Sequence, residues 1–417
     1  MKFIHAADIH LDSPLHRLEV YEGAPVEVIR GASRRAFENL IGLALAEAVD
    51  FVLIAGDLFD GEWRDYNTGL FFVRQMRRLD AAGIPVFVVA GNHDAAGQVT
   101  GGLPYPGNVV LFGHQSAQTR VLEGLRVAVH GRSFGRPAET ENLAAGYPEP
   151  VPGFFNVGLL HTSVTGREGH APYAPCSVGD LTGKGYDYWA LGHVHQFEQV
   201  TLDPPVVFPG CIQGRHIREA GVKGCVLVRV DEGGALDVAL RPLDVVRWVV
   251  LTVDVAGCGS REACLDRLQA VLPGVLAEHA PLPVVVRVTF VGACVAHGVL
   301  AADPEAWTQA VRAAALAVGG EGVWVEKVRL ATRPEGAGSA ADGGGPMGEL
   351  ADYLAALRAD EGALADLGER LADVWRKLPP ELRREGEVVR PDDPEGLRVL
   401  LDEAEALLLR RLREERS

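Results

Sequence analysis

The feature that most constrains the fold is a series of short apolar runs, each of which ends in a cluster of polar residues. Runs rich in β-branched residues, separated by helix-like segments or by loops rich in Gly and Pro, are typical of a layered α/β domain. We assign residues 1–246 to this domain. Its strands are expected at Phe3–Ala7, Phe51–Ala55, Val86–Ala90, Val127–His130, Val157–Leu160 and Tyr188–Leu191, and its helices at Ser33–Glu47 and near Leu70–Leu79.

The polar clusters combine residue types that bind metal ions. They are Asp8-Ile9-His10, Gly56-Asp57, Gly91-Asn92-His93-Asp94, His161 and Gly192-His193-Val194-His195. Residues two apart on an extended segment point to the same side, so the first and last clusters can each direct two ligands into one crevice. In an open α/β sheet that crevice lies beyond the carboxyl ends of the strands, where every cluster falls. The spacing therefore predicts a common metal site.

The mixture of donor atoms indicates the kind of ion. Carboxylate, amide and imidazole ligands suit manganese, iron or zinc better than calcium, which prefers oxygen alone. So many ligands fit two ions better than one, and a bridging carboxylate such as Asp57 could hold them about 3.5–4 Å apart. Two ions at that separation stabilise the attacking and leaving oxygens of a displacement at phosphorus, with a bridging water as nucleophile.

Two other histidines are not expected to bind metal. His5 lies on the opposite face of its predicted strand from Asp8 and His10, which indicates a role in packing. His130 ends an apolar run and is expected to be buried or to contact a ligand rather than to be one.

We expect residues 247–333 to form a small α+β cap domain and residues 334–346 to form a flexible linker. The cap alternates strands at Val249–Val255, Val284–Val291 and Val323–Leu330 with helices at Arg261–Leu272 and Pro304–Val318. The linker is rich in Gly, Ala and Ser and cannot bury apolar surface.

Residues 347–417 are expected to form C-terminal helices. Leucines recur at helical spacing from Leu350 to Leu378, which predicts one amphipathic helix ended by Pro379-Pro380. A last helix is expected to begin at the N-cap Asp393, with Pro394 at its first position. Two helices are too few for a stable core of their own. They either pack on each other and on the main body or dock a partner helix or coiled coil.

The charge balance and the apolar content exclude several classes of protein. Forty Lys and Arg against 56 Asp and Glu give a formal net charge of −16, so the chain as a whole does not attract phosphate backbones or anionic lipid. The longest apolar run, near Pro283–Leu300, is interrupted by Arg287 and His297, so we expect no membrane span. Six scattered cysteines without a Cys-x-x-Cys pair suit a reducing compartment, and a cytoplasmic location is expected.

Over roughly its first half, the chain resembles the calcineurin-like metallophosphoesterase superfamily, with every cluster in the expected order. More narrowly, it is similar to DNA repair exonucleases of the SbcD and YhaO type in the stretches Phe3–Pro14, Gly56–Asp60, Tyr186–His193 and Gly214–Glu219. The resemblance implies a layered metallophosphoesterase β-sandwich flanked by helices. It also implies the small α+β cap domain and a C-terminal helical tail.

The resemblance further implies roles for single residues. One ion would be held by Asp8, His10, Asp57 and His195, and the other by Asp57, Asn92, His161 and His193. His93, next to a ligand, would contact the phosphate and stabilise or protonate the leaving 3′ oxygen. The two divalent ions are expected to be manganese.

The partners implied by the resemblance are DNA and a coiled-coil ATPase of the SbcC or YhaN type, bound by the C-terminal helices. A homodimer is also compatible with the sequence. Arg215, His216 and Arg218 lie a short way beyond His195 and are expected to contact DNA phosphates, although a basic surface cluster can be merely solvated.

Three functions are compatible with this sequence. The leading hypothesis is a two-metal DNA exonuclease or endonuclease acting in DNA repair as the nuclease subunit of a complex with that ATPase. A small-molecule or cyclic-nucleotide phosphodiesterase would use the same metal centre with a different pocket. A non-catalytic scaffold would not need the complete set of ligands. Protein phosphatases carry Asp-Arg-Gly where this chain has Asp60-Gly61-Glu62, which argues against that branch.

Overall fold

The computed structural model describes residues 1–13, 31–60, 66–96, 104–164, 173–335, 346–378, 390–394, 396–398, 400, 401, 404 and 408. The chain divides into two compact units. The first comprises Met1–Asp254, Arg261–Val291 and Leu300–Ala331, and the second Val255–Ser260, Gly292–Val299 and Thr332–Ser417. The predicted linker lies outside the described residues except at its two ends. In the described part of the chain, no helix has the length and apolar content needed to cross a membrane.

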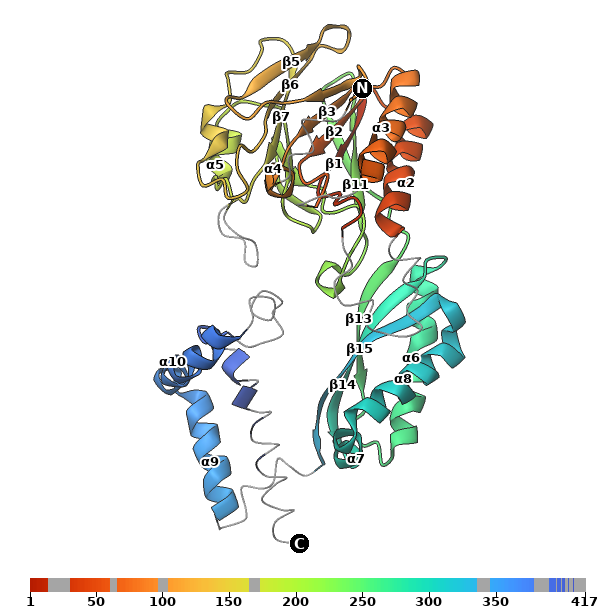
Figure 1. Ribbon diagram of the computed structural model, residues 1–417, viewed down its shortest axis with the longest axis vertical. Helices are drawn as coiled ribbons and strands as arrows, with labels where there is room; N and C mark the ends of the chain where they lie inside the picture. The colour runs from red at the N-terminus through yellow and green to blue at the C-terminus, as the bar shows by residue number, and fades with distance from the viewer. Residues whose placement is uncertain are drawn as a thin grey trace. The chain divides into compact units, whose positions relative to one another are not determined.

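Two six-stranded sheets form the centre of the first unit (Figure 1). The first has the order β12-β11-β1-β2-β3-β4, with strands at Leu236–Pro242, Gly224–Val230, Lys2–Ala6, Phe51–Ala55, Val86–Val89 and Val109–Leu111. Neighbouring strands from β1 to β4 are parallel, whereas β11 is antiparallel to both β1 and β12. The parallel strands therefore direct their carboxyl ends to one edge of the sheet.

The second sheet has the order β5-β6-β7-β8-β10-β9. Its strands span Gln118–Leu122, Val127–Arg132, Phe155–His161, Tyr188–Gly192, Pro205–Phe208 and Glu198–Leu202. The four inner strands are parallel, and the edge strands β5 and β9 are antiparallel to their neighbours. All the strands expected from the sequence of this domain are confirmed.

Six further strands were not expected: β4, β5, β9, β10, β11 and β12. Strands β5, β9 and β12 have partly exposed side chains, and polar residues interrupt their apolar ones. Strand β4 is entirely apolar but only three residues long. Strands β10 and β11 are almost entirely buried, and the same pattern of apolar residues could have predicted them.

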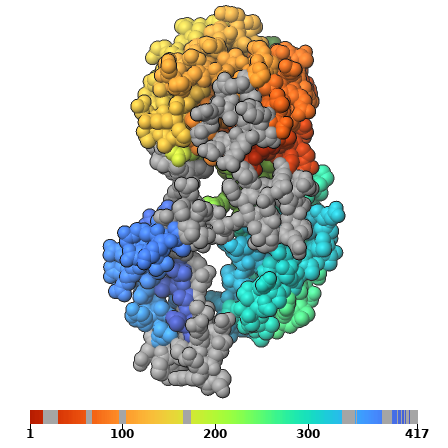
Figure 2. Space-filling view, in the orientation of Figure 1, coloured from red at the N-terminus to blue at the C-terminus, as the bar shows by residue number. Residues whose placement is uncertain are grey.

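Apolar side chains fill the space between the sheets, where Phe3 stacks on Phe51 with ring centroids 4.7 Å apart. The outer face of the first sheet is covered by α2 (Ala32–Glu47) and α3 (Tyr66–Ala81), and that of the second by the short α5 (Val178–Thr182). Figure 2 shows the two covers on opposite sides of this fold, in orange-red and yellow. The expected layered α/β sandwich is confirmed.

The cap sheet in the first unit has the order β13-β14-β15, at Arg247–Asp254, Val284–Cys294 and Val323–Pro334. Strands β13 and β14 are parallel and are joined by α6, at Arg261–His279, which packs against α8, at Pro304–Gly319 (Figure 1). A short helix, α7, spans His297–Ala302. The expected end of α6 at Leu272 is wrong. The helix continues through Pro273, which removes one hydrogen bond while the neighbouring turns keep their packing.

The second unit contains α9, at Pro346–Ala359, and α10, at Glu361–Lys377. The sequence predicted one helix here, but Asp360 interrupts it because its side chain accepts hydrogen bonds from the backbone N–H groups of Gly362 and Ala363. The predicted N-cap Asp393 is confirmed by the bond from Gly396 N to its side chain. Residues 379 and 380, the predicted stop, lie outside the described part.

The tail helices share a small apolar core. Leu354, Leu364, Leu397 and Leu401 are buried together, and partly buried leucines surround them. The interpretation that the predicted helices pack on each other is therefore confirmed.

The remaining described elements are short. They are α4, at Asn92–Ala96, and 3₁₀ turns at Glu123–Leu125, Leu143–Gly146, Ile217–Glu219 and Gly320–Gly322.

Candidate metal centre

The predicted polar clusters follow the carboxyl ends of β1, β2, β3, β7 and β8. The loops after β1 and β2 are joined by backbone hydrogen bonds, from Asp8 N to Gly56 O and from His10 N to Asp57 O, both 3.0 Å. The loop after β8 approaches the first of them, because His193 N donates to the Asp8 carboxylate at 3.0 and 3.2 Å. Residues far apart in the sequence therefore meet in one place.

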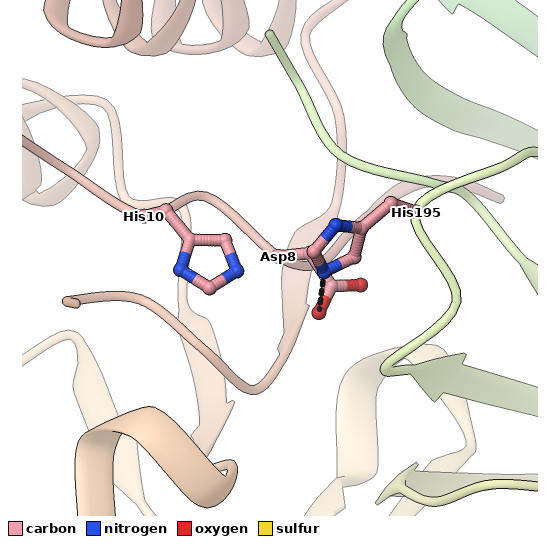
Figure 3. A group of neighbouring side chains, drawn as sticks. All are labelled: Asp8, His10 and His195. Carbon is pink, nitrogen blue, oxygen red and sulfur yellow. Dashed lines mark ion pairs between the residues drawn. The ribbon is translucent and has the colours of Figure 1, made fainter. Parts of the chain in front are cut away.

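One set of donor atoms consists of Asp8, His10 and His195 (Figure 3). One atom from each lies within 4.8 Å of the other two, and His195 Nε2 is 3.6 Å from Asp8 Oδ1. The side chains of Asp8 and His10 are fully buried, whereas His195 is partly accessible. This set corresponds to the first ion site implied by the resemblance.

A second set consists of Asp8, Asp57 and His161. Asp57 Oδ2 lies 3.8 Å from His10 Nε2 and 3.6 Å from His161 Nε2, so one oxygen faces both sets. The other oxygen, Oδ1, accepts a hydrogen bond of 2.9 Å from His93 N. The backbone therefore orients Asp57 so that its carboxylate faces both sets of donor atoms.

Asn92 and His193 lie beside the second set. Asn92 Oδ1 is 3.0 Å from His161 Nε2, and the ring centroids of His193 and His161 are 5.2 Å apart. His193 is not one of the residues in the close sets of donor atoms, although its ring adjoins them. All the predicted ligands thus lie at one centre, and their assignment to individual ions stays a prediction.

His93 lies at the rim of this centre, with 41 % of its side chain exposed. Its Nδ1 is 2.6 Å from Asp60 Oδ1, and its ring centroid is 4.8 Å from that of His10. Burial lowers the pKa of His93, but the hydrogen bond with Asp60 and the charge of Asp57 outweigh it, so the pKa is raised. Nδ1 is engaged with Asp60, which leaves Nε2 for a substrate.

The electrostatics of the centre fit bound cations. Burial raises the pKa of Asp8 to about 7 and also raises that of Asp57, because charged carboxylates are poorly solvated there. Burial lowers the pKa of His161 to about 3, so this imidazole is neutral at pH 7. Among the described residues, neither ring nitrogen of the buried His10 has a hydrogen-bond partner. Divalent ions would satisfy the orphaned imidazole and the charged carboxylates together, so these residues form a dimetal site.

The backbone of the centre has an unusual conformation. Asp8, His10, Asp57 and His193 all have positive φ, of 50°, 45°, 50° and 107°. Such angles cost energy for residues other than glycine and are concentrated at functional sites. Gly91 is required because a Cβ there would lie 2.3 Å from Asp57 Oδ1. The chain accepts local strain to direct its ligands inward.

Two positioning residues were missed by the sequence analysis. Asp94 accepts hydrogen bonds from the backbone N–H groups of Leu58, Phe59 and Gly91, which joins the loops that carry Asp57 and Asn92. Its place in the Gly91–Asp94 cluster was the available signal. Glu219 accepts a hydrogen bond of 2.7 Å from His195 Nδ1. Its place at the end of the family-like stretch Gly214–Glu219 was the available signal.

The predicted DNA contacts have different surroundings. Arg215 is held in an ion pair with Glu219, and 17 % of its side chain is exposed. His216 and Arg218 are exposed. Phosphate contact by these three residues stays a prediction.

The packing role predicted for His5 is confirmed, and His130 is buried, which is one of the two alternatives predicted for it. His5 is buried, with its ring nitrogens 3.0 Å from Tyr188 Oη and from the carbonyl oxygen of Leu191. His130 is buried, with Nδ1 2.9 Å from Thr119 Oγ1 and Nε2 3.0 Å from Asn156 Oδ1.

Family models match two parts of the chain. The calcineurin-like phosphoesterase model matches residues 1–197, and the model of the middle domain of metallophosphoesterase YhaO matches residues 248–333. The chain is 36 % identical over 286 residues to the uncharacterized metallophosphoesterase YhaO of Bacillus subtilis, covering 68 % of this chain and 70 % of that protein.

More distant relatives are DNA double-strand break repair proteins named Mre11. Those of Methanopyrus kandleri and Sulfurisphaera tokodaii are each 27 % identical to this chain, over 271 and 210 residues. The matches cover 57 % and 48 % of this chain. They span 56 % and 51 % of the relatives, so the chain matches about half the length of these proteins.

Proposed function

The chain belongs to the calcineurin-like metallophosphoesterase family, and on that premise we propose that it hydrolyses phosphodiester bonds in DNA. The observation that carries this proposal is His93, an accessible imidazole held by Asp60 at the rim of the dimetal site. Two ions alone suit any phosphoester, whereas an added proton donor suits the poor alkoxide leaving group of a diester.

Each residue of the centre has a defined task in this proposal. When bound, two divalent ions would supply a nucleophilic water and neutralise the charge that develops on the phosphate. Asp57 faces both sets of donor atoms and would hold both ions, and the buried side chains of these sets exclude bulk solvent. His93 donates a proton to the leaving 3′ oxygen through Nε2, while Asp60 keeps the ring oriented. We propose manganese as the native ion because the mixed carboxylate, amide and imidazole donors suit manganese, iron or zinc and the family resemblance implies manganese.

The choice of DNA is supported by the similarity to the Mre11 proteins. The net charge of −16 opposes tight binding of a polyanion. We therefore propose weak DNA binding that depends on the ions, assisted by Arg215, His216 and Arg218. Tight DNA binding in the presence of a chelator would contradict this.

The decisive experiment compares two substrates and two proteins. Release of nucleotides from linear duplex DNA is measured with Mn²⁺ beside hydrolysis of bis(p-nitrophenyl) phosphate, for the wild type and for His93→Ala. We expect the wild type to cleave both, and the variant to lose DNA cleavage by about 10²–10⁴-fold while it still binds Mn²⁺. Cleavage of the small ester alone would favour a small-molecule phosphodiesterase, and cleavage of neither with Mn²⁺ bound would favour a scaffold.

We further propose that the C-terminal helices bind a coiled-coil ATPase. Tyr353 and Val374 expose 63 % and 60 % of their surface on α9 and α10, beside a leucine core that already holds these helices together. An apolar surface on preformed helices suits a partner helix. The test measures binding of a purified coiled-coil ATPase of the SbcC type. We expect the wild type to bind it and the double variant Tyr353→Glu/Val374→Glu to lose binding without any change in ester hydrolysis. Unchanged binding by the double variant would contradict this interface.

A further inference from the structure

Among the predicted metal ligands, His195 differs from His161 in the partner of its outer ring nitrogen. Its Nδ1 contacts a carboxylate oxygen, Glu219 Oε1, at 2.7 Å, whereas His161 Nδ1 faces the neutral carbonyl of Ala55 at 2.9 Å. For His10, no described atom lies within hydrogen-bond distance of either ring nitrogen, and Nδ1 is 3.6 Å from Asp60 Oδ1. A carboxylate behind a ligating imidazole fixes its tautomer and orientation and makes its other nitrogen a stronger ligand.

Glu219 is itself held by a complete set of partners. Only 3 % of its side chain is exposed. Oε1 also accepts from Arg215 Nη2 at 2.8 Å, while Oε2 accepts from the backbone N of Arg215 at 2.7 Å and from its Nε at 3.3 Å. A buried carboxylate requires such pairing, and the two-pronged guanidinium permits only one orientation.

Arg215 also extends toward Asp60, the residue that holds His93. Arg215 Nη1 lies 3.4 Å from Ser13 Oγ and 3.7 Å from Asp60 Oδ2, and Asp60 binds His93. The loop that carries Glu219 is braced from β13, because Trp248 Nε1 donates to the carbonyl oxygen of Gly214 at 2.9 Å. Glu219 and Arg215 therefore form a rigid support directly behind His195.

We propose that Glu219 and Arg215 are positioning residues that hold His195 toward Asp8 and His10, and that they tune the affinity of this ion site separately from the site at His161. Arg215 is thereby assigned to the metal centre in addition to its proposed contact with DNA. The inference depends on the dimetal site but not on the proposed DNA substrate, so it can fail or succeed independently of the nuclease proposal.

The test measures Mn²⁺ binding without any substrate. Glu219→Gln keeps the shape of the side chain and removes its charge. By calorimetric titration, the wild type is expected to bind two ions, and Glu219→Gln to bind one of them about 10–100-fold more weakly, with the other unchanged. Electron paramagnetic resonance at limiting Mn²⁺ is expected to show the coupled two-ion signal of the wild type replaced by that of a single ion.

The cap supplies a matched control. Glu326 accepts from Arg287 Nε at 2.9 Å and from Nη2 at 2.6 Å, a similar two-pronged pair that lacks a histidine. Glu326→Gln should therefore bind both ions as the wild type does. Unfolding in a chelator reports whether each variant is folded. Should Glu219→Gln not fold, Arg215→Lys replaces it, since a lysine keeps the charge but not the two-pronged geometry, and a smaller loss at the same site is expected.

Two results would overturn the proposal. Wild-type affinity for both ions in Glu219→Gln, or in Arg215→Lys where that variant replaces it, would show that the support has no effect on binding. An equal loss at both sites would indicate a general distortion of the centre. The first of these results, combined with a loss of DNA cleavage, would leave Arg215 as a DNA contact only.

Discussion

The metal centre and the C-terminal helices are built on opposite principles. In the metal centre, most buried polar side chains have a defined partner, with His10 as the exception, and several sit on strained backbone. In the helical tail, a few leucines form a small core, and large apolar side chains remain exposed. The centre gives up stability for geometry, whereas the tail gains stability from burial alone. Substitutions should therefore affect chemistry in the centre and folding in the tail.

Removal of the Asp57 charge should separate the effect on chemistry from the effect on folding most clearly. Asp57→Asn is expected to reduce Mn²⁺-dependent hydrolysis of the small ester by more than about 100-fold. That is the largest loss of activity typical for a residue that only contacts a metal ligand. Burial raises the pKa of Asp57, so its charge opposes folding of the metal-free protein. The melting temperature in chelator should therefore stay the same or rise. A large fall in that temperature would show that Asp57 stabilises the metal-free protein, which would contradict a centre that gives up stability for geometry.

Asp60→Asn tests the rim of the centre. The variant keeps the size of the side chain but weakens its bond to His93, so kcat is expected to fall by about 10- to 100-fold. Titration with Mn²⁺ is measured in parallel and should be unchanged, because Asp60 is not one of the predicted ligands. A matching loss of Mn²⁺ affinity would place Asp60 among the ligands instead.

Leu364→Ala tests the tail. Leu364 is 1 % exposed within the leucine core, so truncation is expected to cost about 2–5 kcal/mol in the stability of the tail. Hydrogen exchange along α10 should accelerate, while hydrolysis of the small ester stays at the wild-type rate. Val374→Ala is the control, since a 60 % exposed side chain should change stability by less than about 0.5 kcal/mol. Equal acceleration in both variants would contradict the assigned core.

His5 provides a test by pH within the first unit. Burial lowers the pKa of His5 to about 3, against 6.5 for an unperturbed histidine. Between these values the unfolded chain takes up a proton that the folded chain does not, so stability falls by up to about 1.4 kcal/mol per pH unit as the pH decreases. In urea unfolding of the metal-free protein from pH 7 to pH 5, His5→Gln should lose stability less steeply than the wild type. Parallel curves would argue against a neutral, buried His5.

Local patterns predicted much of the fold and most of the centre. The expected strands of the sandwich and of the cap are all present. Those of the sandwich are buried parallel strands, whose sequences are continuous apolar runs. The metal ligands were found because each directly follows such a run. The helix interruption at Asp360 was missed although its signal is local, since the leucine spacing on both sides masked an N-cap.

The amino-acid sequence by itself determined which residues could be ligands, because a ligand needs only the right side chain at the end of a strand. Tertiary structure alone decided what stands behind each ligand. Glu219 meets His195 across 24 residues, and Asp60 meets His93 across a separate loop. Periodicity and spacing describe neighbours along one strand or helix, whereas these contacts arise only when separate loops converge at the edge of the folded sheets.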